Sequence, residues 1–364
     1  MITTLLVIAI LVLLIVVHEL GHFIAAKFSK VKVQEFGVGY PPRAFSFGKI
    51  GETEYTLNWI PFGGFVRLFG DEGEKEHGRG SLIDAPRWKQ TVILVAGVAM
   101  NALAAWVLFA IALHLGVPQP VSIVPEGATA RLIVSDVVPG SPAYTVGISP
   151  GDEITSVVDI QGTRIIDGIT PQSVSAFVQD HAGKPLEISY VHKGVEKQAT
   201  LIPSQGVLQK AADQPALGVA LVLVANKSLP WGEALYEAGI QTYHAFVTVG
   251  EDLWGLLKTA VYGKPDLSGV VGPVGIVGFV GEAAQNGAGA VLLLAGLISV
   301  NLAIINLVPI PALDGGRLLI LAVEAALRRP APRLVLQALN AIGIALIIFL
   351  MIAVTYQDIT RLIP

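Results

Sequence analysis

Four long apolar stretches divide the chain. The helices that they predict span residues 1–28, 88–116, 288–317 and 334–356. About 20 apolar residues in a helix cross the hydrocarbon core of a bilayer, so each stretch is long enough to span a membrane. A cleaved signal peptide is the alternative for the first stretch, but no basic residue precedes Lys27 and no small-residue cleavage pattern follows. We therefore expect four transmembrane helices.

The segments between these helices show other periodicities. In the first loop, residues 29–87, positions 33–70 alternate apolar and polar side chains around Gly and Pro, which predicts short strands and turns. Such a β-hairpin is either solvated or re-enters the membrane, where non-helical backbone is tolerated if it lines a watery cavity. Residues 229–287 predict an amphipathic helix, suited to a membrane interface or to packing on the bundle, and then a Gly-rich connector over 268–281.

Residues 121–225 predict a compact inserted α/β domain. Within it, residues 138–154 resemble the S-P-A-x-x-A-G-[LI]-x-x-G-D-x-I signature of a PDZ domain, with Val146 where Ala is usual. A helix over 171–181 and strands near 186–192 and 197–202 fit the rest of such a domain.

Charge predicts the orientation. Lys and Arg gather in the first loop and in the segment before the fourth span. Loops rich in Lys and Arg stay in the cytoplasm, so both segments should lie there. The N-terminus, the PDZ-like domain and the C-terminus would then lie outside, with the β-hairpin on the cytoplasmic side.

Composition narrows the class of protein. The 364 residues are 53% hydrophobic and only 14% charged, which indicates an integral membrane protein. A net charge of −4 gives no basic face for nucleic acid. Cys is absent, so disulfides and thiolate ligands are excluded, and any transition-metal site must use His, Asp or Glu.

A metal motif lies near the inner end of the first span. His18 and His22 belong to an H-E-x-x-H sequence. Residues four apart share a helix face, so both imidazoles can bind one Zn²⁺. Glu19 points to a neighbouring face and can take a proton from a water molecule at the metal. Ionisable side chains in a bilayer are costly, which favours a functional explanation over a chance match.

Asp314 is the best candidate for the third ligand. It follows the third span, at the depth of the two histidines if the spans alternate in direction. Pro309 and Pro311 cannot continue a helix, so the chain unwinds there and a carboxylate can turn to the metal.

Other roles and other ligands are open at this position. Asp314 could instead cap the helix that begins near Arg317, a common role for Asp. The rival ligands are His244, Glu282 and Glu324. Charge places the first two on the outer side, and Glu324 fits a cytoplasmic helical surface.

Together these motifs resemble the site-2 protease family of intramembrane zinc metalloproteases, in particular the bacterial regulator-of-sigma-E protease type with a PDZ domain. Residues 18–22 match its H-E-x-G-H, residues 306–315 its N-x-x-P-x-P-x-x-D-G, and residues 63–66 the G-G-[YF]-V of its re-entrant loop. The chain departs from G-F-G-P at residues 39–42 and from G-P-x-x-N at residues 97–101, and one PDZ module stands where some members have two.

The resemblance implies a zinc metalloendopeptidase of the bacterial inner membrane. Its substrates would be transmembrane segments of single-pass proteins, such as anti-sigma factors or remnant signal peptides. The PDZ domain would bind a peptide C-terminus or exclude bulky outer domains. The implied ligands are His18, His22 and Asp314, with Glu19 as the catalytic base. The implied substrate-binding residues are Asn306, Gly63, Gly64, Phe65, Pro309 and Pro311.

A membrane scaffold without catalysis, in which the PDZ module does the work, is the alternative from another class. Loss of a metal ligand or of Glu19 would have indicated it. A zinc transporter fits less well, because its ligands would line a path through the membrane rather than gather at one depth.

Overall fold

The computed structural model describes residues 2–70, 77–122, 124, 130–165, 169–192, 194–206, 214–263, 269–329 and 331–362. The chain folds as two compact units. The helical unit comprises Met1–Leu115 and Leu229–Pro364, and the inserted unit is Gly116–Ser228.

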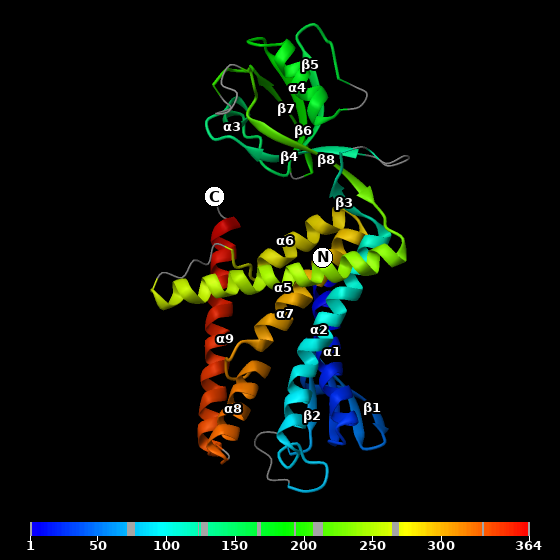
Figure 1. The fold of residues 1–364 in the computed structure, drawn as a ribbon, viewed down its shortest axis with the longest axis vertical. Helices are drawn as coiled ribbons and strands as arrows, with labels where there is room; N and C mark the ends of the chain where they lie inside the picture. Colours follow the sequence, from blue (N-terminus) through cyan, green and yellow to red (C-terminus); the bar gives the residue numbers. More distant parts are fainter. Residues whose placement is uncertain are drawn as a thin grey trace. The chain divides into compact units, whose positions relative to one another are not determined.

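The helical unit is built on the long apolar helices that the sequence predicts (Figure 1). Among the described residues, four are long and apolar enough to cross a membrane: α1 (Ile2–Phe28), α2 (Arg87–Leu115), α7 (Ala288–Leu307) and α9 (Arg333–Leu362). In this unit α2 packs against both α1 and α7. The prediction of four spans is therefore confirmed at the level of length and apolar character.

The third predicted span, residues 288–317, ends earlier than expected. Helix α7 stops at Leu307, and Val308 has the extended backbone (ψ 135°) that a following proline favours. After a short loop, α8 (Asp314–Leu327) begins. The loop therefore separates Asp314 from the end of α7.

One long antiparallel hairpin replaces the short strands predicted in the first loop. Strand β1 (Val33–Ile50) pairs with β2 (Thr53–Leu68) through several register shifts, and both strands contact α1. Glu35 is only 5% exposed in this hairpin. Its carboxylate pairs with Arg43 and Arg67 and accepts a hydrogen bond from Thr56, so the buried charge is compensated.

The predicted Gly-rich connector at 268–281 is wrong from Pro273 onward, where the chain forms a helix. After α5 (Trp231–Val261), α6 (Pro273–Gln285) precedes α7. Asp358 of α9 stabilises the start of α6, since its carboxylate accepts hydrogen bonds from the amides of Gly272 at 3.2 Å and Gly275 at 2.8 Å. That partner is too distant in sequence for local patterns to predict the helix.

The inserted unit contains one sheet with the strand order β3-β8-β4-β5-β6-β7. The strands are β3 (Val117–Pro120), β4 (Ala130–Val137), β5 (Glu153–Asp159), β6 (Leu186–His192), β7 (Val195–Leu201) and β8 (Val219–Lys227). The helices of the unit are α3 (Pro142–Thr145) and α4 (Pro171–Asp180). The predicted helix and the two predicted strands are thus observed.

Asp152 explains part of the signature in this unit. It is 3% exposed and accepts hydrogen bonds from the Ser149 amide at 2.9 Å and from Nδ1 of His192 at 2.8 Å. The carboxylate therefore ties the turn before β5 to the end of β6. Buried apolar side chains of the strands and of α4 form the core of this unit.

Candidate metal centre

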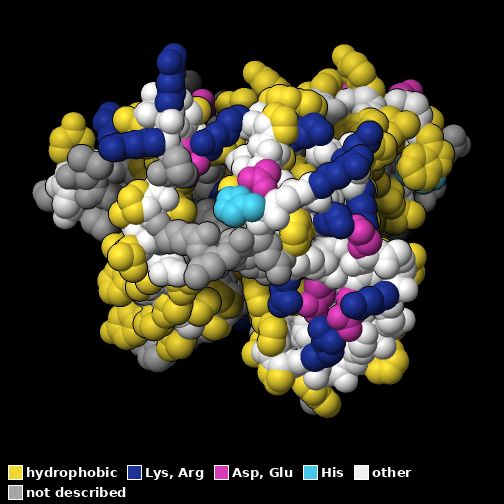
Figure 2. Space-filling model, turned by 90° about the horizontal axis from the view of Figure 1, so that it is seen from below, with side chains coloured by type: hydrophobic (Ala, Val, Ile, Leu, Met, Phe, Trp, Pro, Cys, Tyr) yellow, Lys and Arg dark blue, Asp and Glu magenta, His cyan; other side chains and the backbone are white. Residues whose placement is uncertain are grey.

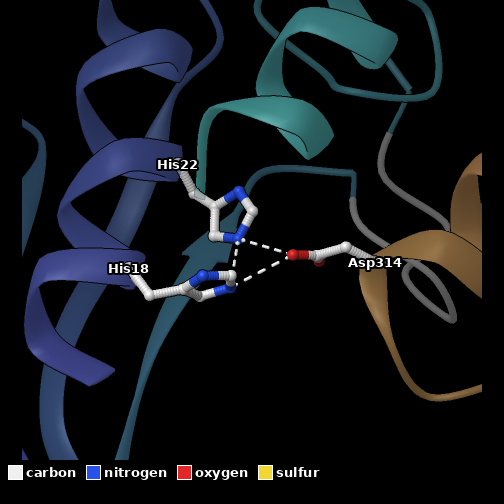
Figure 3. Close-up of side chains that lie close together, drawn as sticks. All are labelled: His18, His22 and Asp314. Carbon is white, nitrogen blue, oxygen red and sulfur yellow. Dashed lines mark hydrogen bonds and ion pairs between the residues drawn. The ribbon is translucent and has the colours of Figure 1, made fainter. Parts of the chain in front are cut away.

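Two histidines of α1 and the first residue of α8 meet inside the helical unit (Figure 3). The Nε2 atoms of His18 and His22 lie 3.1 Å apart, and Oδ2 of Asp314 lies 3.1 Å from the first and 3.2 Å from the second. Both histidines are buried, at 7% and 8% exposure. Within the described part of the chain, this is the one group of three or more His, Cys, Asp or Glu side chains that could hold a metal ion.

The geometry of these three atoms fits zinc. Tetrahedral Zn²⁺ with ligand bonds of about 2.0–2.1 Å separates its ligand atoms by roughly 3.3 Å, close to the observed triangle. Oδ2 of Asp314 is buried and accepts no hydrogen bond. A cation bound between the two imidazole nitrogens and the carboxylate oxygen would compensate the buried charge of Asp314.

Helix α2 fixes the ring of His22. Nδ1 of His22 donates a hydrogen bond of 2.8 Å to the main-chain carbonyl of Ile93, a residue of α2. Because a carbonyl can only accept, Nδ1 carries the proton and Nε2 is left with a lone pair for a metal. The neighbour across the helix interface therefore selects the tautomer that zinc binding requires.

The same helix reaches the histidines because it carries a glycine at residue 97. A Cβ atom at Gly97 would lie 2.4 Å from Nε2 of His22 and 2.7 Å from Cε1 of His18. A real Cβ never comes so close to another heavy atom, so α2 can approach the two histidines only without a side chain here.

Glu19 lies against the hairpin, beside the two histidines. Its carboxylate accepts a hydrogen bond from the main-chain amide of Val66. A Cβ atom on Gly64 would lie 3.3 Å from Cγ of Glu19. Strand β2 thus runs directly beside this carboxylate, next to the two histidines.

The other predicted site residues lie on β2, at the end of α7 and in the loop that follows α7. Gly63 and Phe65 flank Gly64 on β2. Asn306 lies in the last turn of α7 and is half-buried, while Pro309 and Pro311 lie in the loop before Asp314.

The structure also places the alternatives for the third ligand. Leu313 is the N-cap of α8, so Asp314 is the first helical residue and not the cap. The carboxylate of Glu324 pairs with Arg87. His244 lies on α5 and Glu282 on α6, so Asp314 is the one of these residues that meets the histidines.

Sequence reasoning missed the contacts that hold the site from behind. The carbonyl of Ile93 and the amide of Val66 are main-chain groups, which have no sequence signature. Gly97 and Asn101 could have been found, because they occupy the ends of the altered G-P-x-x-N motif.

A further contact holds the loop that carries Asp314. A Cβ atom on Gly343 of α9 would lie 1.9 Å from the main-chain oxygen of Pro311. We expect Gly343→Ala to push this loop away from the histidines and to weaken zinc binding by about tenfold, which corresponds to about 1.4 kcal/mol. Competition with a chromophoric chelator measures the affinity. Gly255→Ala on α5, where a Cβ atom meets nothing, should bind zinc as the wild type does; equal affinity for both variants would contradict the expectation.

Comparison with known proteins assigns the chain to a family. The profile of peptidase family M50 matches residues 6–350, which is nearly the whole chain. The chain belongs to peptidase family M50. A protein of Clostridium perfringens whose name gives it as a presumed zinc metalloprotease is 33% identical over 349 residues, which cover 95% of each chain. A protein of Clostridium acetobutylicum with the same description is 30% identical and covers 95% of this chain and 94% of its own.

Family membership establishes the class of enzyme. The M50 protein is a zinc metalloprotease, a hydrolase of peptide bonds with Zn²⁺ as its cofactor. Its four apolar helices make it a multi-pass membrane protein.

One solved structure matches part of the chain. The PDZ domain of an SdrC-like protein from Listeria monocytogenes is 22% identical to the chain, covers 28% of it and 93% of its own length, and has a TM-score of 0.20. The likeness of the inserted unit to PDZ domains rests on the signature in its sequence at residues 138–154.

Proposed function

We propose that this M50 protease cleaves the transmembrane segments of single-pass membrane proteins, with zinc held by His18, His22 and Asp314. The observation that carries the proposal is the position of the three ligand atoms. Two of them come from α1, an apolar helix of 27 residues, and meet the third within 3.2 Å. A metal centre with two of its ligands on such an apolar helix is suited to cleave peptide bonds that lie in the bilayer.

Glu19 is the proposed general base. Zinc, when bound, polarises the substrate carbonyl and lowers the pKa of water. The Glu19 carboxylate takes a proton from the attacking water and delivers it to the leaving amine. The amide of Val66, which donates to this carboxylate, holds it in one orientation. The histidines and Asp314 keep their positions through α2 and the loop before α8.

The hairpin is the proposed site for the substrate chain. A helical substrate must unwind before a carbonyl can be attacked, because its carbonyls are already hydrogen-bonded. The extended segment then adds as a strand to the hairpin beside Gly63, Gly64 and Phe65. Because Gly64 has no side chain, strand β2 lies close to Glu19. Asn306 donates a hydrogen bond to the extended segment, with Pro309 and Pro311 shaping the loop on the other side.

Charge supports an orientation in which this end of the helical unit faces the cytoplasm. Figure 2 views the protein from the end where β1, β2, the end of α8 and the start of α9 lie in Figure 1, and Lys and Arg side chains are spread over that face. The hairpin then re-enters the membrane from the cytoplasmic side of a bacterial inner membrane. The inserted unit lies outside and acts as a PDZ domain that binds a new C-terminus or excludes bulky outer domains.

A cleavage assay with the purified protein in detergent and a tagged single-pass substrate tests this function. The substrate can be an anti-sigma factor shortened on its outer side or a remnant signal peptide. We expect the wild type to cut inside the transmembrane segment, and chelation or Asp314→Ala to stop cleavage. Mass spectrometry of the fragments locates the cut. Cleavage that persists without metal, or that falls only outside the apolar segment, contradicts the proposal. Binding of the substrate without any cleavage would favour the scaffold.

A further inference from the structure

Asn101 is a buried side chain that touches a proposed zinc ligand from behind. It lies on α2, one turn after Gly97, and is 0% exposed. Its Nδ2 lies 3.4 Å from Nδ1 of His18. Its Oδ1 is buried with no hydrogen-bond partner. A fully buried amide therefore has its acceptor unused and its donor on a histidine nitrogen.

If His18 is a zinc ligand, the side-chain amide of Asn101 must have the opposite orientation. If Nε2 of His18 binds the metal, the proton of the neutral ring is on Nδ1, which then needs an acceptor. The oxygen and nitrogen of a side-chain amide have nearly the same shape, and their assignment follows from the hydrogen bonds they can make. Rotating the amide by half a turn places Oδ1 against Nδ1–H of His18. That rotation satisfies both the histidine and the unpartnered oxygen.

We propose that Asn101 is the positioning residue for His18, accepting the Nδ1–H of the ring through Oδ1 so that Nε2 points to the zinc. The inference rests on the proposed function, since it assigns the proton of one proposed ligand. Helix α2 would then supply a hydrogen-bond acceptor to each of the two histidines. Ile93 accepts from His22 through a main-chain carbonyl, and Asn101 accepts from His18 two turns later. One helix thereby sets the tautomer of both histidines.

The neighbouring helix holds Asn101 by its main chain and leaves its side chain free for His18. The Ser299 hydroxyl of α7 donates a hydrogen bond of 2.8 Å to the main-chain oxygen of Asn101. Ser299 is also 0% exposed. Ser299 therefore belongs to the same buried contact between α2 and α7. A substitution of Ser299 changes this packing without changing the side-chain amide of Asn101, so the two effects on zinc affinity can be told apart.

Zinc affinity of the full-length protein in detergent tests the proposal, because it does not depend on catalysis. Asn101→Leu removes the acceptor at similar volume and should weaken zinc binding by about 10–100-fold, the range for loss of such supporting hydrogen bonds. Asn101→Asp keeps an acceptor and should bind zinc within about threefold of the wild type. The visible spectrum of the Co²⁺-substituted protein should change for Asn101→Leu, since the His18 ring is no longer held.

Matched variants separate this role from a structural one. Ser299→Ala should lower the unfolding temperature while zinc affinity stays unchanged. Asn301→Leu changes an exposed asparagine whose amide donates to Leu297 in its own helix, and it should also leave the affinity unchanged. If Asn101→Leu does not fold, tight zinc binding by Asn101→Asp supports the proposal, and weak binding by both variants overturns it.

The remaining outcomes distinguish this inference from the proposed function. If His18→Ala loses zinc but Asn101→Leu binds it as the wild type does, the role of Asn101 is wrong and the metal site stands. The same holds if Ser299→Ala weakens zinc binding as much as Asn101→Leu, because general packing then explains the loss. If His18→Ala binds zinc as tightly as the wild type, the proposed ligand set itself fails.

Discussion

Glu19→Gln is expected to reduce cleavage by about 10²–10⁴-fold, the usual contribution of a positioned general base, while zinc content stays at the wild-type level. The amide has the same shape as the carboxylate and can still accept the hydrogen bond from Val66. It cannot take a proton from water at neutral pH. Single-turnover cleavage of the tagged substrate, with zinc content measured on the same sample, checks this result.

The control for Glu19→Gln is the same substitution at a glutamate outside the proposed site. Glu237 is exposed on α5, and Glu237→Gln should cleave at the wild-type rate. If Glu19→Gln also cleaves at that rate, another group acts as the base and the mechanism must be redrawn. If it loses zinc together with activity, Glu19 supports the metal site rather than the proton transfer.

Gly97→Ala is expected to abolish both zinc binding and cleavage. The added methyl would lie 2.4 Å from Nε2 of His22, the atom that faces the metal. The ring must move, or α2 must separate from α1. We expect a loss of zinc affinity of at least about 100-fold, equivalent to about 2.7 kcal/mol. Chelator competition measures the affinity, and circular dichroism checks that the helices remain.

A glycine in open space provides the comparison for this substitution. A Cβ atom at Gly250 of α5 meets nothing, so Gly250→Ala should bind zinc normally and should stabilise its helix slightly. Wild-type zinc affinity in Gly97→Ala would mean that α2 does not approach the histidines as closely as the structure shows.

Local sequence patterns predict those parts of the molecule that depend on nearby residues. The apolar length of α1 and the H-E-x-x-H spacing both lie within one helix, so both could be read directly. Asp314 could be inferred because Pro309 and Pro311 end the helix before it. The inferred placement of the ligand atoms in one group agrees with the structure, while their binding of zinc is a proposal that the variants above test.

The features that sequence could not predict depend on distant partners. Helix α6 is stabilised by Asp358, a residue of α9. The hairpin is one long pair of strands because it packs along α1, whereas its Gly and Pro residues alone indicate several turns. The proton on His22 is fixed by a carbonyl of α2, and main-chain groups leave no trace in the sequence.

The proposed zinc ligands are far apart in the sequence, with two on α1 and the third at the start of α8. A protein is made from its N-terminus, so His18 and His22 emerge from the ribosome long before Asp314. The helix α9, whose Gly343 contacts the loop before Asp314, is made later still. A growing chain therefore lacks the complete set of proposed ligands until α8 has been made. By this arrangement the proposed metal site forms only after both α1 and α8 have been made, so a chain that ends before α8 has no proposed catalytic centre.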